Sequence, residues 1–393
     1  MAQKKIIIIG GGAAGLMAAD RLCDNFDIDI YEKGKTLGRK FLVAGNGGFN
    51  LTNKAEGKDL VQHYLPNDFL KKALLENDSS KMSNWLADLG IPTFVGTSGR
   101  IFPEKGIKPA QVLKKIKDRL AKKGVNFFVH HEFIGFDKKC NCIVTNKERE
   151  QILEADYFIF SLGGASWSKT GSDGKWTTAF DKIGIKTVPF QASNCGLNIE
   201  WSDHFKTHHA GKPLKNIKIE IDSFEVKGET MITDHGLEGN AIYPLIWKVR
   251  EAFSKGNIPT INIDFKPLNS RAQLLHKIKN KAQKTKAFAQ ALNLNSTQIA
   301  LLKSFSEKKY FLEPSVFITS VKHLQIPIQS LRPIEEAIST VGGIDLEEVN
   351  PDFCLKKYPS IFVIGEMLDW DAPTGGFLLQ ACFSMAQAVG IKK

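Results

Sequence analysis

The sequence lacks several features that would place it outside the ordinary globular proteins. No apolar run approaches the ~20 residues that a membrane-spanning helix needs. The short apolar run near the N-terminus enters a glycine turn directly, which is unlike a signal peptide. Internal repeats and low-complexity segments are also missing. We therefore expect a soluble, cytoplasmic protein with no membrane partner.

Cysteine is scarce and scattered, with six residues in a chain of 393 and no C-x-x-C pair. The pair Cys140 and Cys142 lacks the spacing of a zinc site. His130 and His131 are neighbours in a predicted strand, so their side chains point to opposite faces and cannot easily share a metal ion. The sequence thus predicts reduced thiols and no metal centre.

Acidic residues are outnumbered by basic ones, which gives a net charge of +11. This excess fits a polyanionic partner such as nucleic acid, or an anionic cofactor together with a basic solvated surface. The basic residues are spread along the chain, which favours the second interpretation. A predicted helical stretch from Ser270 to Leu302 carries several of them, but no aromatic platform for bases is interleaved. Nucleic acid is therefore the less favoured partner.

The most informative stretch is a short apolar run that leads into a glycine-rich turn. Residues 5–9 read as a buried parallel strand, because the four isoleucines that follow Lys5 are β-branched and show no polar alternation. A G-x-G-x-x-G pattern follows at Gly10, Gly12 and Gly15, and a helix-forming segment comes next. In a dinucleotide-binding unit these glycines allow a tight turn, the approach of a pyrophosphate and close helix packing, in that order. The start of the helix then offers N–H groups and a positive dipole end to phosphates.

A second predicted strand, Ile28 to Tyr31, ends in the carboxylate of Glu32. At this spacing from the glycines, a carboxylate accepts hydrogen bonds from the hydroxyl groups of a ribose and repels a 2′-phosphate. The combination of strand, glycines, helix, strand and acid therefore indicates FAD or NAD rather than NADP. A single G-x-G-x-x-G is present, so any NAD(P)H would visit the flavin without a Rossmann domain of its own.

Residues 38–53 read G-R-K-F-L-V-A-G-N-G-G-F-N-L-T-N, a loop rich in glycine and asparagine directly after the ribose acid. This stretch resembles the signature of the BaiN/YhiN-type bacterial flavoproteins, which include aminoacetone oxidase-like members. The commoner family pattern has Arg and Cys where Gly48 and Phe49 stand here. The sequence is more similar to a subfamily with G-R-K-F-L-x-A-G-x-G-G-x-N-L-T. The resemblance implies FAD, an oxidoreductase activity and the fold of the two-dinucleotide-binding-domain flavoproteins.

Three further stretches carry the same resemblance. Residues 99–103 are similar to a G-R-x-F-P loop that lies near the flavin in the family. Residues 155–174 resemble a buried strand with a Gly-Gly end and an S-x-P-x-x-G-S-D-G loop. Residues 361–377 resemble G-E-x-L-D-x-x-G-P-T-G-G-Y/F before a final helix. In the family this helix would begin at the N1/C2=O edge of the flavin, where its dipole stabilises the negative charge of the reduced ring.

The predicted class is α/β: a Rossmann-like FAD-binding domain with an inserted antiparallel β domain and a small helical cap. We expect the FAD-binding domain in two segments, 1–188 and 335–393. The insertion, 189–334, is β-rich by its period-two pattern and contains a helical subdomain at about 268–305. The carboxyl ends of the parallel strands are the expected ligand edge.

From the motif and the resemblance together we predict one cofactor site for FAD. Its predicted residues are Gly10, Gly12, Ala13, Ala14, Gly15, Glu32, Lys33, Arg39, Lys40, Asn50, Thr52, Phe133, Gly163, Gly365, Glu366, Gly375, Gly376 and Phe377. The backbone near Phe133 is assigned to the adenine by resemblance alone. No catalytic acid or base can be named from the sequence. Asp369, Asp371 and His235 are candidates, although a structural role is favoured for each.

The predicted function is an FAD-dependent oxidoreductase that transfers hydride between the flavin and a small organic substrate, with NAD(P)H as a transient reductant. Flavin carries out the redox chemistry, and the protein positions it and tunes its electronics. Two alternatives stay open: a flavoprotein that modifies or binds tRNA or other nucleic acid, and a non-catalytic flavin redox sensor. The inserted domain contains no chemical motif, so the sequence does not identify the substrate or the oligomeric state.

Overall fold

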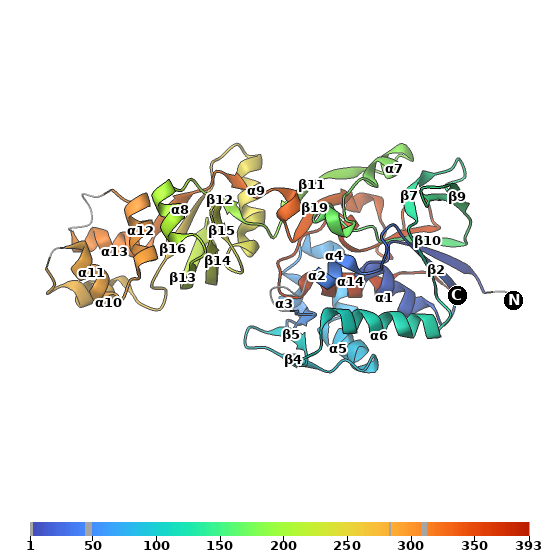
Figure 1. Cartoon of the computed structure of the whole chain (residues 1–393), viewed down its shortest axis with the longest axis horizontal. Coiled ribbons are helices and arrows are strands. Elements are labelled where there is room, and N and C mark those ends of the chain that lie inside the picture. The colour runs from blue at the N-terminus through green and yellow to red at the C-terminus, as the bar shows by residue number, and fades with distance from the viewer. Residues whose placement is uncertain (1–2, 44–48, 283, 308–312, 393) are drawn as a thin grey trace. The chain divides into compact units, whose positions relative to one another are not determined.

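The computed structural model describes all residues except 1–2, 44–48, 283, 308–312 and 393. The chain forms two compact units, which Figure 1 colours along the sequence. Unit 1 contains residues 1–192 and 334–393, and unit 2 contains residues 193–333. Among the described residues, no helix has both the length and the apolar character needed to cross a bilayer.

Unit 1 is built on a five-stranded sheet in the order β20-β10-β1-β2-β6, with every pair parallel. Its strands are β1 (Lys5–Ile9), β2 (Asp27–Glu32), β6 (Asn126–Val129), β10 (Tyr157–Phe160) and β20 (Ile361–Val363). The four isoleucines of β1 are each at most 3% exposed, because neighbouring strands and packed helices cover both faces. Burial of each such side chain contributes roughly 1.5–3 kcal/mol, so the central strand anchors the core.

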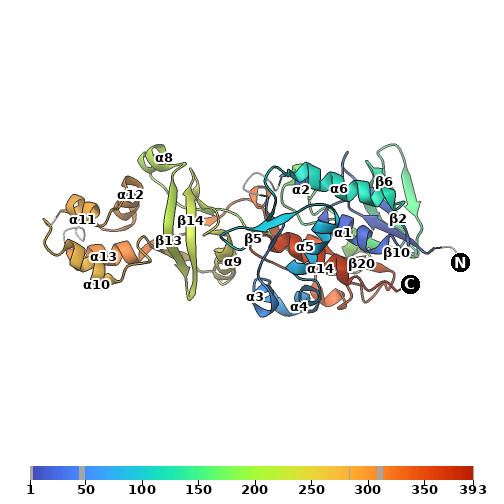
Figure 2. The ribbon, with the colours of Figure 1, turned by 90° about the horizontal axis from the view of Figure 1, so that it is seen from below.

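Helices pack against this sheet, and α1 and α14 lie side by side in both views (Figures 1 and 2). The helices of unit 1 are α1 (Ala13–Leu22), α2 (Arg39–Val43), α3 (Gly57–Val61), α4 (Asn67–Glu76), α5 (Ser79–Asp88), α6 (Pro109–Lys122), α7 (Thr177–Lys182) and α14 (Phe377–Ala388). Thus the first and the last long segments of the chain join one core. The apolar residues from Phe69 to Leu89 recur at a helical period, which predicts one helix. The structure has two helices there, because Asp78 accepts two backbone N–H bonds and caps the start of α5.

Three small sheets complete unit 1. They are β3 (Thr52–Asn53) with β5 (Arg100–Pro103) and β4 (Thr93–Val95); β7 (Glu132–Phe136) with β8 (Cys142–Thr145) and β9 (Glu150–Leu153); and β11 (Thr187–Ser193) with β19 (Ser339–Ile344). The segment 99–103 was expected to be a loop, but most of it is strand β5, which pairs with β3 and β4. Residues 44–48, in the middle of the predicted cofactor-lining loop, lie outside the described residues.

Unit 2 contains a seven-stranded sheet in the order β17-β16-β13-β14-β15-β12-β18, and each of its pairs is antiparallel. Its strands are β12 (Leu197–Asn198), β13 (Pro213–Ile221), β14 (Phe224–Ile232), β15 (Gly236–Glu238), β16 (Thr260–Asp264), β17 (Leu324–Pro327) and β18 (Ser330–Leu331). Alternate residues of β13 are buried, as expected for a sheet with one covered face. Together with the parallel sheet of unit 1, this confirms the predicted α/β class with separate antiparallel sheets.

The helices of unit 2 are α8 (Asp203–His209), α9 (Ile246–Ser254), α10 (Arg271–Ile278), α11 (Thr285–Ala291), α12 (Ser296–Phe305) and α13 (Pro314–Lys322). The last four gather at one end of the unit in both ribbon views (Figures 1 and 2). The helical region therefore extends beyond the predicted range of about 268–305. Pro314 begins α13 at a position where its missing N–H is not needed. Proline is thus a helix-start signal here.

Candidate functional site

The glycine-rich turn connects β1 to α1 at the carboxyl edge of the parallel sheet, and its three glycines meet different surroundings. Gly10 has a φ of +106°, and a Cβ there would lie 2.4 Å from the carbonyl oxygen of Ser161. A Cβ at Gly15 would lie 2.2 Å from the carbonyl oxygen of Gly10. At Gly12, the residue before α1, a Cβ would meet no atom within 4 Å. The protein itself thus requires glycine at the first and third positions, whereas the second faces open space at a helix start.

The carboxylate of Glu32 is fixed by two backbone N–H groups beside this turn. Its Oε2 accepts a hydrogen bond of 2.9 Å from Gly11 N, and its Oε1 accepts one of 2.6 Å from Gly34 N. Each carboxylate oxygen can accept a further bond, so the side chain remains able to hold ribose hydroxyl groups. The open space at Gly12 and the oriented acid together fit the pyrophosphate and ribose of a dinucleotide.

The loop after β10 folds against the segment that follows Glu32. Lys33 Nζ lies 3.1 Å from Asp173 Oδ1, and Arg39 Nη2 donates to the carbonyl of Lys169 at 2.6 Å. Gly163 begins this loop with a φ of +74°, and a Cβ there would lie 2.8 Å from Ser172 Oγ. Lys33 and Arg39, which are predicted to bind the cofactor, therefore form an ion pair and a hydrogen bond with the loop after β10.

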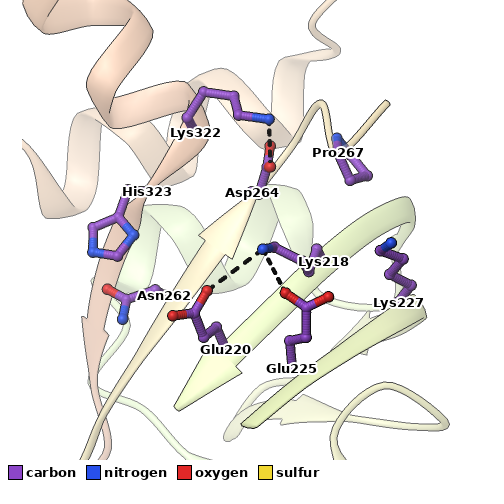
Figure 3. Close-up of a pocket in the computed structure, with 9 residues that line it drawn as sticks. All are labelled: Lys218, Glu220, Glu225, Lys227, Asn262, Asp264, Pro267, Lys322 and His323. Carbon is purple, nitrogen blue, oxygen red and sulfur yellow. Dashed lines mark hydrogen bonds and ion pairs between the residues drawn. The ribbon is translucent and has the colours of Figure 1, made fainter. Parts of the chain in front are cut away.

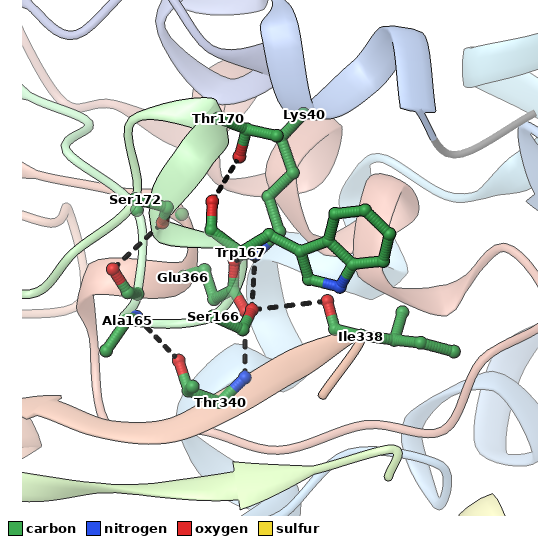
Figure 4. Close-up of polar contacts among 12 residues, drawn as sticks. Lys40, Ala165, Ser166, Trp167, Thr170, Ser172, Ile338, Thr340 and Glu366 are labelled. Atoms are coloured by element: carbon green, nitrogen blue, oxygen red, sulfur yellow. Dashed lines mark hydrogen bonds and ion pairs between the residues drawn. The ribbon is translucent and has the colours of Figure 1, made fainter. Parts of the chain in front are cut away.

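A polar network at the same edge contains Lys40 and Glu366 (Figure 4). Lys40 Nζ lies 2.8 Å from Glu366 Oε2 and donates to Ser166 Oγ at 2.8 Å. The other carboxylate oxygen, Oε1, accepts a bond of 2.9 Å from Thr340 N. The network thereby joins α2, the loop after β10, β19 and the end of β20. It also holds the Glu366 carboxylate where hydroxyl groups of a ribityl chain could bind.

The start of α14 is held by two segments that are distant from it in the sequence. Gly376 has a φ of +104°, and a Cβ there would lie 2.3 Å from the backbone of Thr52. Asn53 Nδ2 donates to the carbonyl of Gly375 at 3.1 Å, and Tyr64 Oη donates to the carbonyl of Phe377 at 2.8 Å. This clamp leaves the backbone N–H groups of the first turn of α14 fixed in one direction, as a flavin edge would require.

Two further side chains complete the surroundings of this turn. The His63 ring stacks on Phe377 with centroids 4.2 Å apart. Arg100 Nε lies 3.3 Å from the position that a Cβ on Gly375 would take. Burial lowers the pKa of His63, although the nearby Asp59 acts in the opposite direction. Burial also raises the pKa of Tyr64 well above its usual value, so its hydroxyl stays protonated and donates.

The remaining predicted residues divide into those near the turn and those elsewhere. Ala13 and Ala14 begin α1, and a Cβ on Gly365 would lie 3.0 Å from that of Ala14. Asn50 lies just before β3. The Phe133 ring, in contrast, packs in a buried aromatic cluster with Phe160, so only its backbone could meet an adenine.

The three acid–base candidates have separate surroundings. Asp369 Oδ1 accepts a hydrogen bond of 2.9 Å from Gly342 N. Asp371 is buried and exchanges two backbone hydrogen bonds with Leu65. His235 lies in unit 2 and is exposed, in the turn between β14 and β15. These contacts give both aspartates structural roles.

Sequence reasoning missed Tyr64, His63 and Thr340, because each reaches the site only through tertiary contacts. Their short segments carry no motif, so no local signal could have identified them. Cys382, in α14, was likewise not predicted as part of the site. Burial, aided by the charge of Glu366, raises the pKa of its thiol to about 12.

Unit 2 has a polar pocket of about 270 Å³ on its sheet (Figure 3). The lining residues are Lys218, Glu220, Glu225, Lys227, Asn262, Asp264, Pro267, Lys322 and His323. Lys218 Nζ lies 2.7 Å from Glu225 Oε2 and 3.5 Å from Glu220 Oε2. Lys322 Nζ lies 2.6 Å from Asp264 Oδ2. Lysines therefore engage all three carboxylates, and the pocket contains none of the residues predicted for the cofactor.

Comparison with known families assigns the chain to one of them. The family model described as "HI0933-like protein Rossmann domain" matches residues 4–392, nearly the whole chain. This chain belongs to the HI0933-like family. The predicted resemblance to BaiN/YhiN-type flavoproteins is thereby confirmed at the level of the family. The protein is a flavoprotein oxidoreductase, and its cofactor is FAD.

Two known relatives match this chain over almost their full lengths. A 3-dehydro-bile acid delta(4,6)-reductase of Clostridium scindens is 24% identical, over 99% of this chain and 98% of the relative. A ribosomal RNA dihydrouridine synthase of Haemophilus influenzae is 23% identical, over 98% of this chain and 97% of the relative. Among solved structures, a 3-ketosteroid delta1-dehydrogenase from Sterolibacterium denitrificans superposes with a TM-score of 0.52 at 12% identity, covering 98% of each chain. That likeness shows a shared fold.

Proposed function

We propose that the protein reduces a carbon–carbon double bond conjugated to a carbonyl group in a small organic substrate, using bound FAD. The observation that supports this proposal is a group of residues at one sheet edge, which we call the cradle. It consists of Gly12, Glu32, the Lys40–Glu366 pair and the start of α14. NAD(P)H is proposed as the reductant. Because one G-x-G-x-x-G is present, it would reach the flavin without a second Rossmann domain.

The names of the two relatives support this reaction type. A 3-dehydro compound with delta(4,6) double bonds has those bonds conjugated to the 3-carbonyl. Dihydrouridine differs from uridine by two hydrogens added to a double bond conjugated to a ring carbonyl. Both products arise when hydride adds to the carbon remote from the carbonyl and a proton adds to the nearer one. This shared chemistry is what we propose for the present chain.

Each part of the cradle has a proposed task. The open space at Gly12 and the N–H groups at the start of α1 bind the pyrophosphate, and Glu32 binds the ribose. The Lys40–Glu366 pair holds the ribityl chain. The N–H groups that begin α14 face the N1/C2=O edge and favour negative charge there. Once bound and reduced by NAD(P)H, FAD would supply the hydride.

A second candidate is the same reduction carried out on a uracil base in RNA. Between Asp264 and Glu307 the sequence holds eight lysines and arginines and no aspartate or glutamate. Two relatives, from Haemophilus influenzae and Escherichia coli, are named ribosomal RNA dihydrouridine synthases. Phosphate contacts by such a basic stretch would weaken steeply as salt is added, whereas binding of an uncharged substrate would not.

The test is anaerobic re-oxidation of photoreduced enzyme. Purified FAD-loaded protein is mixed with 4-androstene-3,17-dione, cyclohex-2-enone, a uracil-containing RNA or their saturated counterparts, and the visible flavin band is followed. We expect recovery of the band with a conjugated compound and none with its saturated counterpart, with the reduced product seen by mass spectrometry. Re-oxidation by RNA alone would select the second candidate. Failure of every conjugated probe would contradict the proposed reaction.

A further inference from the structure

Trp167 has an unusual backbone conformation and an exposed side chain. Its φ and ψ are 57° and 54°, in the left-handed region that bulky residues rarely adopt. Its residue exposure is 39%, so the indole is not held in the core. A strained backbone at a bulky residue persists only where the surroundings fix it, and such positions cluster at functional sites.

Hydrogen bonds fix the backbone on both sides of Trp167 (Figure 4). On the following side, the backbone N and Oγ1 of Thr170 donate to the carbonyl of Trp167 at 2.7 and 2.8 Å. On the preceding side, buried Ser166 accepts the bond from Lys40 Nζ and donates to the carbonyl of Ile338 at 3.4 Å. These bonds therefore fix the backbone from which the indole projects.

The other tryptophans serve different purposes. Four of them are at most 9% exposed, and each indole N–H donates a hydrogen bond: Trp85, Trp176, Trp201 and Trp370. Trp247, in unit 2, is half-buried with Lys248 Nζ over its ring. Trp167 has no core position and, among the described residues, no cation over its ring, and its neighbour Ser166 is bonded to Lys40 of the Lys40–Glu366 pair. Core packing therefore does not account for its presence in the loop.

We propose that Trp167 is a specificity-determining residue whose indole stacks on the flat conjugated ring of the substrate. This inference rests on the reaction proposed above. A conjugated enone or a uracil is planar and presents a π-face to the indole. The reduced product has a puckered ring that fits the indole face less well. The indole thus favours binding of the substrate over the product, which assists release after reduction.

The test compares ligand binding to the oxidised, FAD-loaded protein, in which no turnover occurs. The probe pairs are 4-androstene-3,17-dione with androstane-3,17-dione, and uridine monophosphate with dihydrouridine monophosphate. Changes in the flavin spectrum give Kd for each probe. Trp167→Asn and Trp167→Gly remove the ring, and both residues tolerate the left-handed backbone, so the loop is expected to keep its shape. Trp167→Phe keeps an aromatic face, and Trp247→Phe is the matched control in unit 2.

We expect wild type to bind a conjugated probe more tightly than its saturated partner. Loss of the ring should weaken the conjugated probe roughly 2- to 10-fold, the size of one aromatic stacking contact, and leave the saturated probe unchanged. Trp167→Phe should retain most of the preference, and Trp247→Phe all of it. Equal weakening of both probes, an unchanged preference in both ring-less variants, or no binding of either conjugated probe to wild type would overturn the proposal. If photoreduced wild type is re-oxidised by a conjugated probe while the preference survives loss of the ring, Trp167 fails and the proposed reaction stands.

Discussion

At the scale of single residues, Gly12 and Gly15 offer a matched pair. A side chain at Gly15 would collide with the backbone of Gly10, whereas one at Gly12 would meet only open space. We expect Gly15→Ala to destabilise the FAD-free protein by roughly 1–3 kcal/mol, the usual cost of overpacking. Gly12→Val should leave that stability nearly unchanged and weaken FAD binding by at least about a hundredfold, or ~2.7 kcal/mol.

Thermal unfolding of the FAD-free proteins and titration with FAD separate these two effects. If Gly12→Val binds FAD as wild type does, the open space at the start of α1 is not the pyrophosphate site. If Gly15→Ala is as stable as wild type, the close packing of α1 on β1 has been misjudged.

His63 gives a pH-dependent prediction for the same region. Burial lowers its pKa in the folded protein, so the unfolded chain binds the proton more readily. Stability should therefore be complete above the unfolded value of about 6.5 and decline as the pH falls through it. His63→Phe keeps a ring stacked on Phe377 but cannot be protonated. We expect a shallower decline between pH 7 and pH 5 in denaturant titrations, and an unchanged slope would contradict the assignment.

The sequence could place Gly10, Gly12, Gly15 and Glu32 at one turn, because a short motif with fixed spacing predicts that arrangement. It could not identify Tyr64 or Trp167. The first reaches the site through a carbonyl of α14 more than three hundred residues away. The second stands out only by its backbone conformation and exposure, which no local pattern encodes.

At the scale of elements, we expect the backbone N–H groups at the start of α14 to raise the redox potential of the bound flavin. Phe377 is the first helical residue, where proline is tolerated, but proline removes the backbone N–H. Phe377→Pro and Phe377→Leu both lose the ring, and Leu keeps the N–H. Gly376 is a poorer probe, because its φ of +104° excludes proline.

We expect the two-electron potential of bound FAD to be lower in Phe377→Pro than in Phe377→Leu by up to some tens of millivolts. One helix-dipole contact contributes roughly 0.3–2 kcal/mol, and 30 mV corresponds to about 1.4 kcal/mol. Spectroscopic titration against a reference dye measures the difference. Equal potentials in two variants that both retain FAD would mean that this turn does not face the flavin.

The type of an element could be predicted where its apolar pattern is long and regular, and could not be predicted where the pattern is short. The apolar runs of β1 and β10 have their predicted type, within two residues at their ends. The amphipathic pattern from Pro109 to Lys123, with Gly124 after it, likewise predicts the helix found as α6. Strand β5 is four residues long and takes its identity from pairing with β3 and β4, so its sequence reads as a loop. The cap at Asp78, which divides α4 from α5, was present in the sequence but was outweighed by the continuous apolar period.

At the scale of the whole molecule, the division of labour between the units is a prediction. Strands β11 and β19 form a two-stranded sheet, and the chain leaves unit 1 at the end of the first and returns shortly before the second. Replacement of residues 193–333 by a short Gly-Ser linker should therefore leave unit 1 folded. We expect this shortened protein to bind FAD within about tenfold of the full chain and to lose reduction of conjugated probes.

Flavin content and activity of the shortened protein are the readouts, with its Gly12→Val variant as the control for specific binding. A folded, shortened protein that takes up no FAD would place part of the cofactor site in unit 2. Retention of full activity would mean that unit 2 does not contribute to the substrate site.

The central claim is that the carboxyl edge of the parallel sheet holds one FAD. The most direct measurement is to unfold the purified protein, remove bound nucleotide, and refold it separately with FAD, FMN and NAD. Bound nucleotide is then identified and counted by chromatography. The account predicts one FAD per chain, no stable uptake of FMN, which lacks the adenosine half held by Gly12 and Glu32, and no uptake of NAD in place of FAD. Stable uptake of FMN or NAD alone would contradict it.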